Sequence, residues 1–126
     1  MNVTQDRPVF LNLLRIKQPV AAVVSILHRL TGFIMVILLP GMIYLLQLSL
    51  TSPDGFSQVV SIMDNNLVRV TGVFICWMFA HHFLAGLRFL LLDFDVGISR
   101  DAARKTAWIV HVGAVLIAAI AAGLLL

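Results

Sequence analysis

The apolar stretch LVRVTGVFICWMFAHHFLAGLRFLLL, residues 67–92, decides the fold of this chain. It is longer than the roughly 20 residues that an α-helix needs to cross the hydrocarbon core of a membrane. His81 and His82 lie inside it, and an imidazole at that depth is costly unless it faces a bundle interior, a ligand or a metal. With Gly86 one turn further on and Arg88 near the end, the stretch predicts a membrane helix equipped to hold a haem.

The composition indicates an integral membrane protein. The chain has 126 residues, of which 60% are hydrophobic and 12% are charged, and its mean hydropathy is +1.00. A soluble domain of this length could not bury so much apolar surface. We therefore expect a single all-α membrane domain over residues 1–126, with any soluble chemistry on a partner. The net charge of +3 comes from basic residues that flank apolar segments, which argues against a nucleic-acid partner.

Hydropathy predicts three transmembrane helices, over about residues 20–50, 67–92 and 107–126. The first is long, so we expect Pro19 to Arg29 to be an interfacial lead-in and the embedded helix to begin near Ile26. Pro40-Gly41 predicts a kink within it. The connection that follows begins with Ser52-Pro53-Asp54-Gly55, a turn signal, and then a short amphipathic turn.

The distribution of Lys and Arg predicts the orientation in the membrane. The connection over residues 51–66 carries no Lys or Arg. Cations gather instead in the N-terminal segment 1–19, at the start of the first span and between the second and third spans, at Arg7, Arg15, Lys17, Arg29, Arg100, Arg104 and Lys105. The positive-inside rule then puts the N-terminus in the cytoplasm and the C-terminus in the periplasm. The N-terminal segment lacks a signal-peptide pattern, which favours a bacterial inner membrane and a multi-pass protein.

The chain has a single cysteine, which excludes an iron–sulfur cluster and a covalently attached haem as cofactors of this chain alone. Cys76 lies in an apolar run and is read as a small buried hydrophobe. One thiol cannot form an intrachain disulfide, nor can it anchor an iron–sulfur cluster, which needs about four thiolates. The chain also has no Cys-x-x-Cys-His pattern. Any haem would therefore be bound non-covalently through histidine.

A second polar group lies at the cytoplasmic start of the first span. Ser25 and Arg29 are spaced i, i+4, so a helix aligns them on one face, with His28 and Gly32 on a neighbouring face. A hydroxyl and a guanidinium there could bind a carbonyl oxygen of a quinone, and Arg29 with His28 could pair with haem propionates. The alternative is a snorkelling interfacial arginine beside a helix-capping serine.

The remaining titratable residues of the spans are assigned weaker roles. His81 and His82 are about 100° apart on a helix, so they face different neighbours and cannot both ligate one iron. For an isolated intramembrane histidine, haem ligation and a hydrogen-bonded structural role are equally good interpretations. Arg88 could reach a propionate or a headgroup. Asp93 could be a proton donor near the site, but the favoured interpretation is a helix-end partner for Arg88. His111 is expected at the interface.

Three segments together resemble a known family. They are Arg7-Pro8-Val9-Phe10-Leu11-Asn12-Leu13, then Ser25-Ile26-Leu27-His28-Arg29-Leu30-Thr31-Gly32, then His82-Phe83-Leu84-Ala85-Gly86-Leu87-Arg88 followed by Leu92-Asp93-Phe94. The chain is similar to the cytochrome b large membrane-anchor subunit of succinate dehydrogenase, respiratory complex II, in its bacterial form. The Ser-x-x-His-Arg-x-x-Gly and His-x-x-x-Gly-x-Arg elements are specific as a pair. Some relatives carry another histidine where this chain has Phe89.

The resemblance implies a function and a set of site residues. Such an anchor shares one haem b with a second small anchor subunit, and His82 matches its axial ligand. His28 and Arg29 match residues beside the haem propionates, and Ser25 and Arg29 match ubiquinone-site residues. The flavoprotein and iron–sulfur subunits would carry the succinate chemistry of the tricarboxylic acid cycle. The chain alone would not be a catalyst, and trimers of such heterotetramers are an open option.

Three alternatives stand beside this interpretation. A fumarate reductase anchor would oxidise quinol, typically menaquinol, in the reverse direction. A haem-free structural anchor would use His82 only as a hydrogen-bonding group between helices. A small transporter could line a path with Arg29 and His82, although the chain shows no internal repeat and no membrane-embedded acids.

Overall fold

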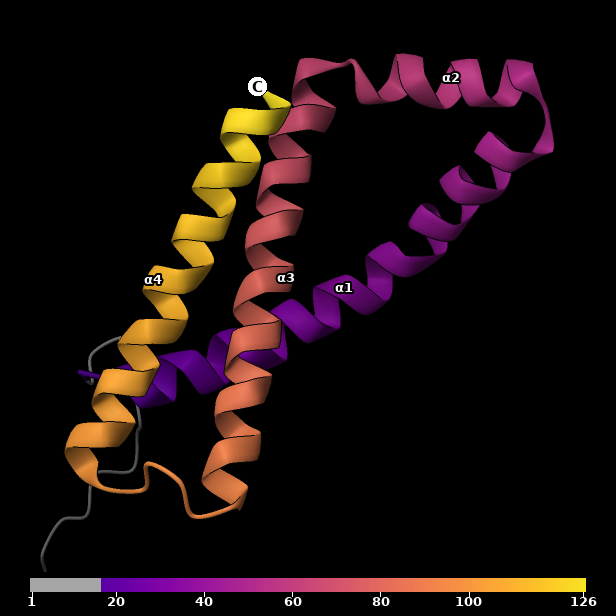
Figure 1. Ribbon diagram of the computed structural model, residues 1–126. Helices are drawn as coiled ribbons and strands as arrows, with labels where there is room; N and C mark the ends of the chain where they lie inside the picture. The colour runs from indigo at the N-terminus through magenta and orange to yellow at the C-terminus, as the bar shows by residue number, and fades with distance from the viewer. Residues whose placement is uncertain (1–16) are drawn as a thin grey trace, which may run out of the picture.

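The computed structural model describes residues 17–126, which form four helices (Figure 1). They are α1 (Val20–Thr51), α2 (Pro53–Met63), α3 (Asn66–Asp93) and α4 (Arg100–Leu125). Helices α1, α3 and α4 are long and apolar enough to cross a membrane, which confirms the three predicted membrane helices. Arg7, Arg15 and the Arg7–Leu13 segment of the resemblance lie outside the described residues.

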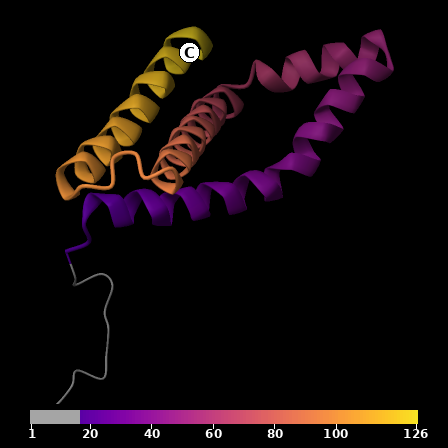
Figure 2. The same ribbon diagram turned by 60° about the horizontal axis from the view of Figure 1, so that its bottom comes forward.

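Two of the long helices form a pair that the third crosses. α3 and α4 run side by side along their length. The first half of α1 crosses α3, and the second half of α1 diverges from α3 (Figures 1 and 2). The buried core lies at this crossing and consists of Val24, Ala85, Ala107 and Val110. Small residues suit the position, because helices in hydrocarbon associate through close backbone packing rather than through a hydrophobic effect.

α1 is one continuous helix from Val20 to Thr51. The predicted interfacial lead-in, up to Arg29, is therefore part of the same helix rather than a separate segment. The helix continues through Pro40 and changes direction in its second half (Figure 2), in agreement with the predicted kink. This bend carries the second half of α1 away from α3 (Figure 1).

The connection after α1 is more regular than the sequence signal indicated. Instead of a tight turn, Ser52 caps α2: its hydroxyl oxygen accepts a hydrogen bond from the Gly55 amide at 3.0 Å. Pro53 takes the first helical position and Asp54 lies in the first turn. Both residues favour a helix N-terminus. Proline has no amide hydrogen that would need a partner there, and the carboxylate interacts favourably with the positive end of the helix dipole.

α4 begins at Arg100 rather than near residue 107. The Ser99 hydroxyl oxygen accepts a hydrogen bond from the Ala102 amide at 3.3 Å, and Asp101 lies in the first turn. The cations that predicted a loop are thus on the first turns of a helix. The short connection before it turns through Asp95 and Gly97, which have φ values of 59° and 79°.

Arg88 joins α3 to α4. Its side chain is buried, its Nε donates to the Thr106 hydroxyl at 3.1 Å, and its terminal nitrogen donates to the Ala103 carbonyl at 3.2 Å. The expected pairing with Asp93 is wrong, because Asp93 is exposed and makes no ion pair with Arg88. The guanidinium prefers α4 because the start of α4 offers two acceptors in a site away from water, where a hydrogen bond is strong.

We expect Arg88→Ala to lower the free energy of unfolding in detergent by about 1–3 kcal/mol, because two charge-assisted hydrogen bonds between helices are lost. Arg104→Ala is the matched control. Arg104 pairs with Asp101 at 3.7 Å and its side chain is 70% exposed, so its loss should change stability little. Equal stability of the two variants would contradict the role of Arg88 as a link between α3 and α4.

Candidate functional site

Two histidines that are far apart in the sequence meet where α1 crosses α3. The rings of His28 and His82 stack with their centroids 4.0 Å apart and their planes 12° from parallel. Phe89 contacts the edge of the His28 ring, at 5.2 Å between centroids. The sequence assigned both histidines to one site but did not predict that their rings would be in contact.

Each of these histidines lies against a glycine of the opposite helix. A Cβ added to Gly32 of α1 would lie 2.8 Å from His82 Cε1, whereas one added to Gly86 of α3 would lie 3.7 Å from His28 Nε2. A side chain at position 32 would therefore collide with the His82 ring, whereas a methyl group at position 86 would make an ordinary van der Waals contact with His28. The sequence signal for this reciprocal packing is the His-x-x-x-Gly spacing, which occurs in both helices.

The hydrogen bonds of His82 determine its tautomer. Its Nδ1 lies 3.0 Å from the main-chain carbonyl oxygen of His28 and 3.3 Å from Thr31 Oγ1. A carbonyl can only accept, so Nδ1 carries a hydrogen, and in the neutral imidazole Nε2 then keeps its lone pair. No hydrogen bond to Nε2 is formed by residues 17–126. A neutral imidazole held through one nitrogen with the other free is the arrangement that metal-ligating histidines usually have.

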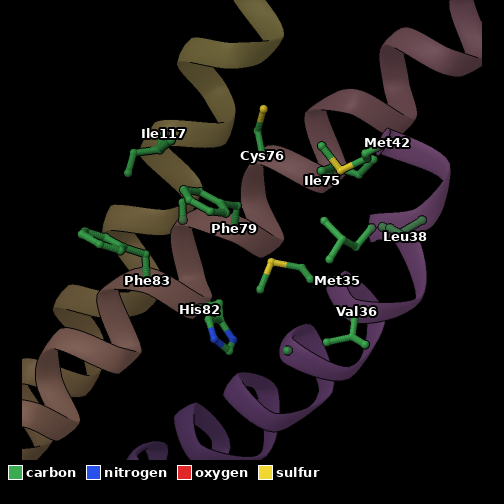
Figure 3. Close-up of a pocket in the computed structure, with 13 residues that line it drawn as sticks. Met35, Val36, Leu38, Met42, Ile75, Cys76, Phe79, His82, Phe83 and Ile117 are labelled. Carbon is green, nitrogen blue, oxygen red and sulfur yellow. The ribbon is translucent and has the colours of Figure 1, made fainter. Parts of the chain in front are cut away.

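A large apolar cavity begins at His82. Its volume is about 890 Å³, within the range of about 300–1,000 Å³ that is usual for small-molecule and cofactor sites. His82 projects toward α1 at one end, and the other lining residues come from α1 and α3, with Ile117 from α4 (Figure 3). Most of the lining is aliphatic, aromatic or methionine side chains, including Met35, Leu38, Met42, Ile75, Phe79 and Phe83.

The cavity and its histidine fit a haem. In residues 17–126 no three His, Cys, Asp or Glu side chains come together to hold a bare metal ion. A metal at His82 would therefore need most of its ligands from another source, as a porphyrin provides. The lining is apolar and His82 presents one unpaired nitrogen at its end, which suits an apolar macrocycle with an axial imidazole.

The other two histidines of the spans lie elsewhere. His81 is fully buried, and its ring faces His111 of α4 at 5.1 Å and Trp77 at 5.8 Å between centroids. Neither His81 nor His111 lines the cavity. The two adjacent histidines of α3 thus face different neighbours, as their spacing predicts, and only His82 is available to a ligand in the cavity.

Ser25 and Arg29 lie one turn apart on α1, and each directly follows a residue of the crossing, Val24 and His28 respectively. Ser25 is half-buried and Arg29 is exposed. Within residues 17–126, Arg29 forms no ion pair and neither residue is hydrogen-bonded to His82. A polar pair that is open to its surroundings can bind a ligand or a partner from outside this chain. Neither residue lines the cavity, although Gly32 of the next helical turn does.

Together these features define a class of protein: a helical membrane protein with one imidazole directed into an intramembrane cofactor-sized cavity. The chain belongs to the succinate dehydrogenase/fumarate reductase transmembrane subunit family, whose pattern matches residues 3–122. It is therefore a multi-pass membrane protein, and its bacterial relatives support an inner-membrane location.

Two relatives illustrate the similarity. The chain is 30% identical over 107 residues to the succinate dehydrogenase cytochrome b556 subunit of Coxiella burnetii, covering 84% of this chain and 86% of that one. It is 29% identical over 113 residues to the protein of the same name from Paracoccus denitrificans, covering 90% of this chain and 87% of that one. These relatives indicate a cytochrome b membrane subunit and confirm the resemblance read from the sequence.

Proposed function

We propose that this chain anchors a succinate dehydrogenase in the membrane and that His82 is an axial ligand of a haem b shared with a second anchor subunit. The observation that carries the proposal is the geometry of His82: Nδ1 is held by the His28 carbonyl at 3.0 Å, and the ring borders the apolar cavity. The chain offers one imidazole there, so the second axial ligand would come from the partner. A bound haem would accept and donate single electrons.

The residues around His82 have separable tasks in this proposal. The stacked His28 ring and the close backbone at Gly32 restrict the position of the imidazole. The apolar lining would exclude water from a haem held by His82 and would thereby influence its redox potential. His28, which lies at the crossing, and Arg29, the next residue of α1, are the groups proposed to pair with the propionates.

Ser25 and Arg29 are proposed to contribute to the ubiquinone-reduction site. The Ser25 hydroxyl can donate a hydrogen bond to a quinone carbonyl, and the Arg29 guanidinium can stabilise the negative charge that develops on reduction. The positive-inside pattern places this end of α1 at the cytoplasmic face, where the iron–sulfur and flavoprotein subunits would dock. The N-terminus would then be cytoplasmic and the C-terminus periplasmic.

Purification of the intact complex through a tag on this chain tests the proposal. We expect a b-type reduced-minus-oxidised absorbance, a co-purified flavoprotein, and succinate oxidation by ubiquinone. A complex with flavin but no haem would instead support a haem-free structural anchor. Quinol-driven fumarate reduction that exceeds succinate oxidation would support the fumarate reductase-type anchor.

Ser25→Ala should lower kcat/KM for ubiquinone about fivefold to tenfold, because a hydrogen bond of about 1 kcal/mol to the quinone is lost. Succinate oxidation with an artificial acceptor that accepts electrons directly from the flavoprotein should not change. The matched control is Ser49→Ala on the same helix, where the hydroxyl donates to the Leu46 carbonyl at 2.7 Å. Equal ubiquinone kinetics for both variants would contradict the role of Ser25.

A further inference from the structure

We propose that Thr31 is a positioning residue for His82: its hydroxyl oxygen, with the His28 carbonyl, fixes the ring and sets the midpoint potential of the haem. This inference rests on the proposed role of His82 as an axial ligand. Thr31 would touch neither the haem nor the quinone. It would act through the ring nitrogen that faces away from the metal.

Burial and geometry single out Thr31 at the crossing. Its side chain is 2% exposed. The hydroxyl lies 2.8 Å from the Leu27 carbonyl and 3.1 Å from the His28 carbonyl, and either can accept its hydrogen. When that hydrogen goes to one of these carbonyls, a lone pair of Oγ1 is free to accept from His82 Nδ1, 3.3 Å away.

The two acceptors share one hydrogen. Because the His28 carbonyl at 3.0 Å requires the hydrogen on Nδ1, the Thr31 oxygen takes part as a second acceptor of the same N–H group. Acceptors on this side of an imidazole hold its orientation and increase its basicity as a metal ligand. A more basic ligand stabilises the oxidised iron relative to the reduced iron, so each acceptor lowers the midpoint potential.

Among the polar contacts of the His82 ring, the one with Thr31 can be removed by a side-chain substitution. The His28 ring covers one face of His82, and the backbone at Gly32 lies against its edge. Both contacts restrict the position of the ring. The Thr31 hydroxyl can be removed by substitution with valine, which keeps the shape of the side chain, whereas the His28 carbonyl belongs to the main chain.

Redox titration of the purified complex tests the proposal. Thr31→Val should keep its haem and raise the midpoint potential of the haem by about 30–60 mV. For one electron this corresponds to a threefold to tenfold change in the oxidised-to-reduced equilibrium, about the size expected for a lost contact to a ligating histidine. Thr31→Ser, which retains the hydroxyl, should restore the wild-type potential. The matched control is Thr71→Val on α3, because the exposed Thr71 bonds the Leu67 carbonyl at 2.8 Å in the same way but lies away from His82.

The outcomes separate the two proposals. Wild-type potentials in Thr31→Val, or equal shifts in Thr31→Val and Thr31→Ser, would overturn the role of the hydroxyl. If valine disturbs assembly, Thr31→Ala gives a second variant without the hydroxyl, and the same upward shift is expected. Failure of the ligand assignment would appear differently, as haem retained when His82 itself is replaced.

Discussion

His82→Ala should yield a complex that lacks the b-type absorbance, with haem content at least tenfold below that of the wild type. The substitution removes the one imidazole that borders the apolar cavity. The cavity would keep its apolar lining, but hydrophobic contact alone leaves the iron without an axial ligand from this chain. Haem content by extraction and a reduced-minus-oxidised spectrum of the tagged complex give the measurement.

Two further histidine variants are the controls for this result. His111→Ala removes an imidazole of α4 that does not line the cavity, so it should leave the spectrum unchanged. His81→Phe keeps an aromatic ring in a fully buried position next to Trp77 and His111. It should keep its haem, because His81 does not line the cavity and both of its ring nitrogens lack hydrogen-bond partners within the described residues, so no hydrogen bond is lost.

Addition of imidazole distinguishes a missing ligand from a collapsed site. A free imidazole that enters the space left by His82→Ala can ligate the iron in place of the side chain, so part of the absorbance should return. Haem retained unchanged in His82→Ala would contradict the assignment. If haem is lost instead in His81→Phe, the ligand is His81 and not His82.

The sequence predicted the membrane helices because hydropathy integrates over many residues. It placed α1 and α3 within a few residues of their observed bounds, but it placed the start of α4 too late. The first turns of α4 carry Arg100 and Arg104, and their low hydropathy led to the prediction of a loop there. The local signal for a helix there is the Ser99 cap, which a hydropathy scan does not register.

The site was predicted as a set of residues but not as an arrangement. Helical geometry predicts that His81 and His82 face different neighbours, and the family resemblance is what favours His82 as the ligand. The stacking of His28 on His82 and the role of Thr31 depend on where α1 crosses α3. A crossing point is a tertiary property, and the sequence indicates it only through the repeated His-x-x-x-Gly spacing.

Gly32→Ala should lower haem content about tenfold or more and destabilise the crossing of α1 and α3 by about 1–3 kcal/mol. The new Cβ would lie 2.8 Å from Cε1 and 3.3 Å from Nδ1 of His82. The ring cannot retreat freely, because it stacks on His28 and is hydrogen-bonded to the His28 carbonyl. Either the ring leaves that carbonyl or the helices separate, and both changes misplace Nε2.

The other glycines of the spans make this prediction specific. Gly41→Ala, on the same helix, meets nothing within 4 Å and should leave haem content unchanged, with a stability gain of up to about 1 kcal/mol from helix propensity. Gly86→Ala makes an ordinary contact, 3.7 Å from His28 Nε2, and should also keep its haem. The steric argument therefore requires a graded series in which only Gly32→Ala loses the absorbance. Equal losses at Gly32 and Gly86 would mean that helix proximity in general, rather than the position of the His82 ring, limits haem binding.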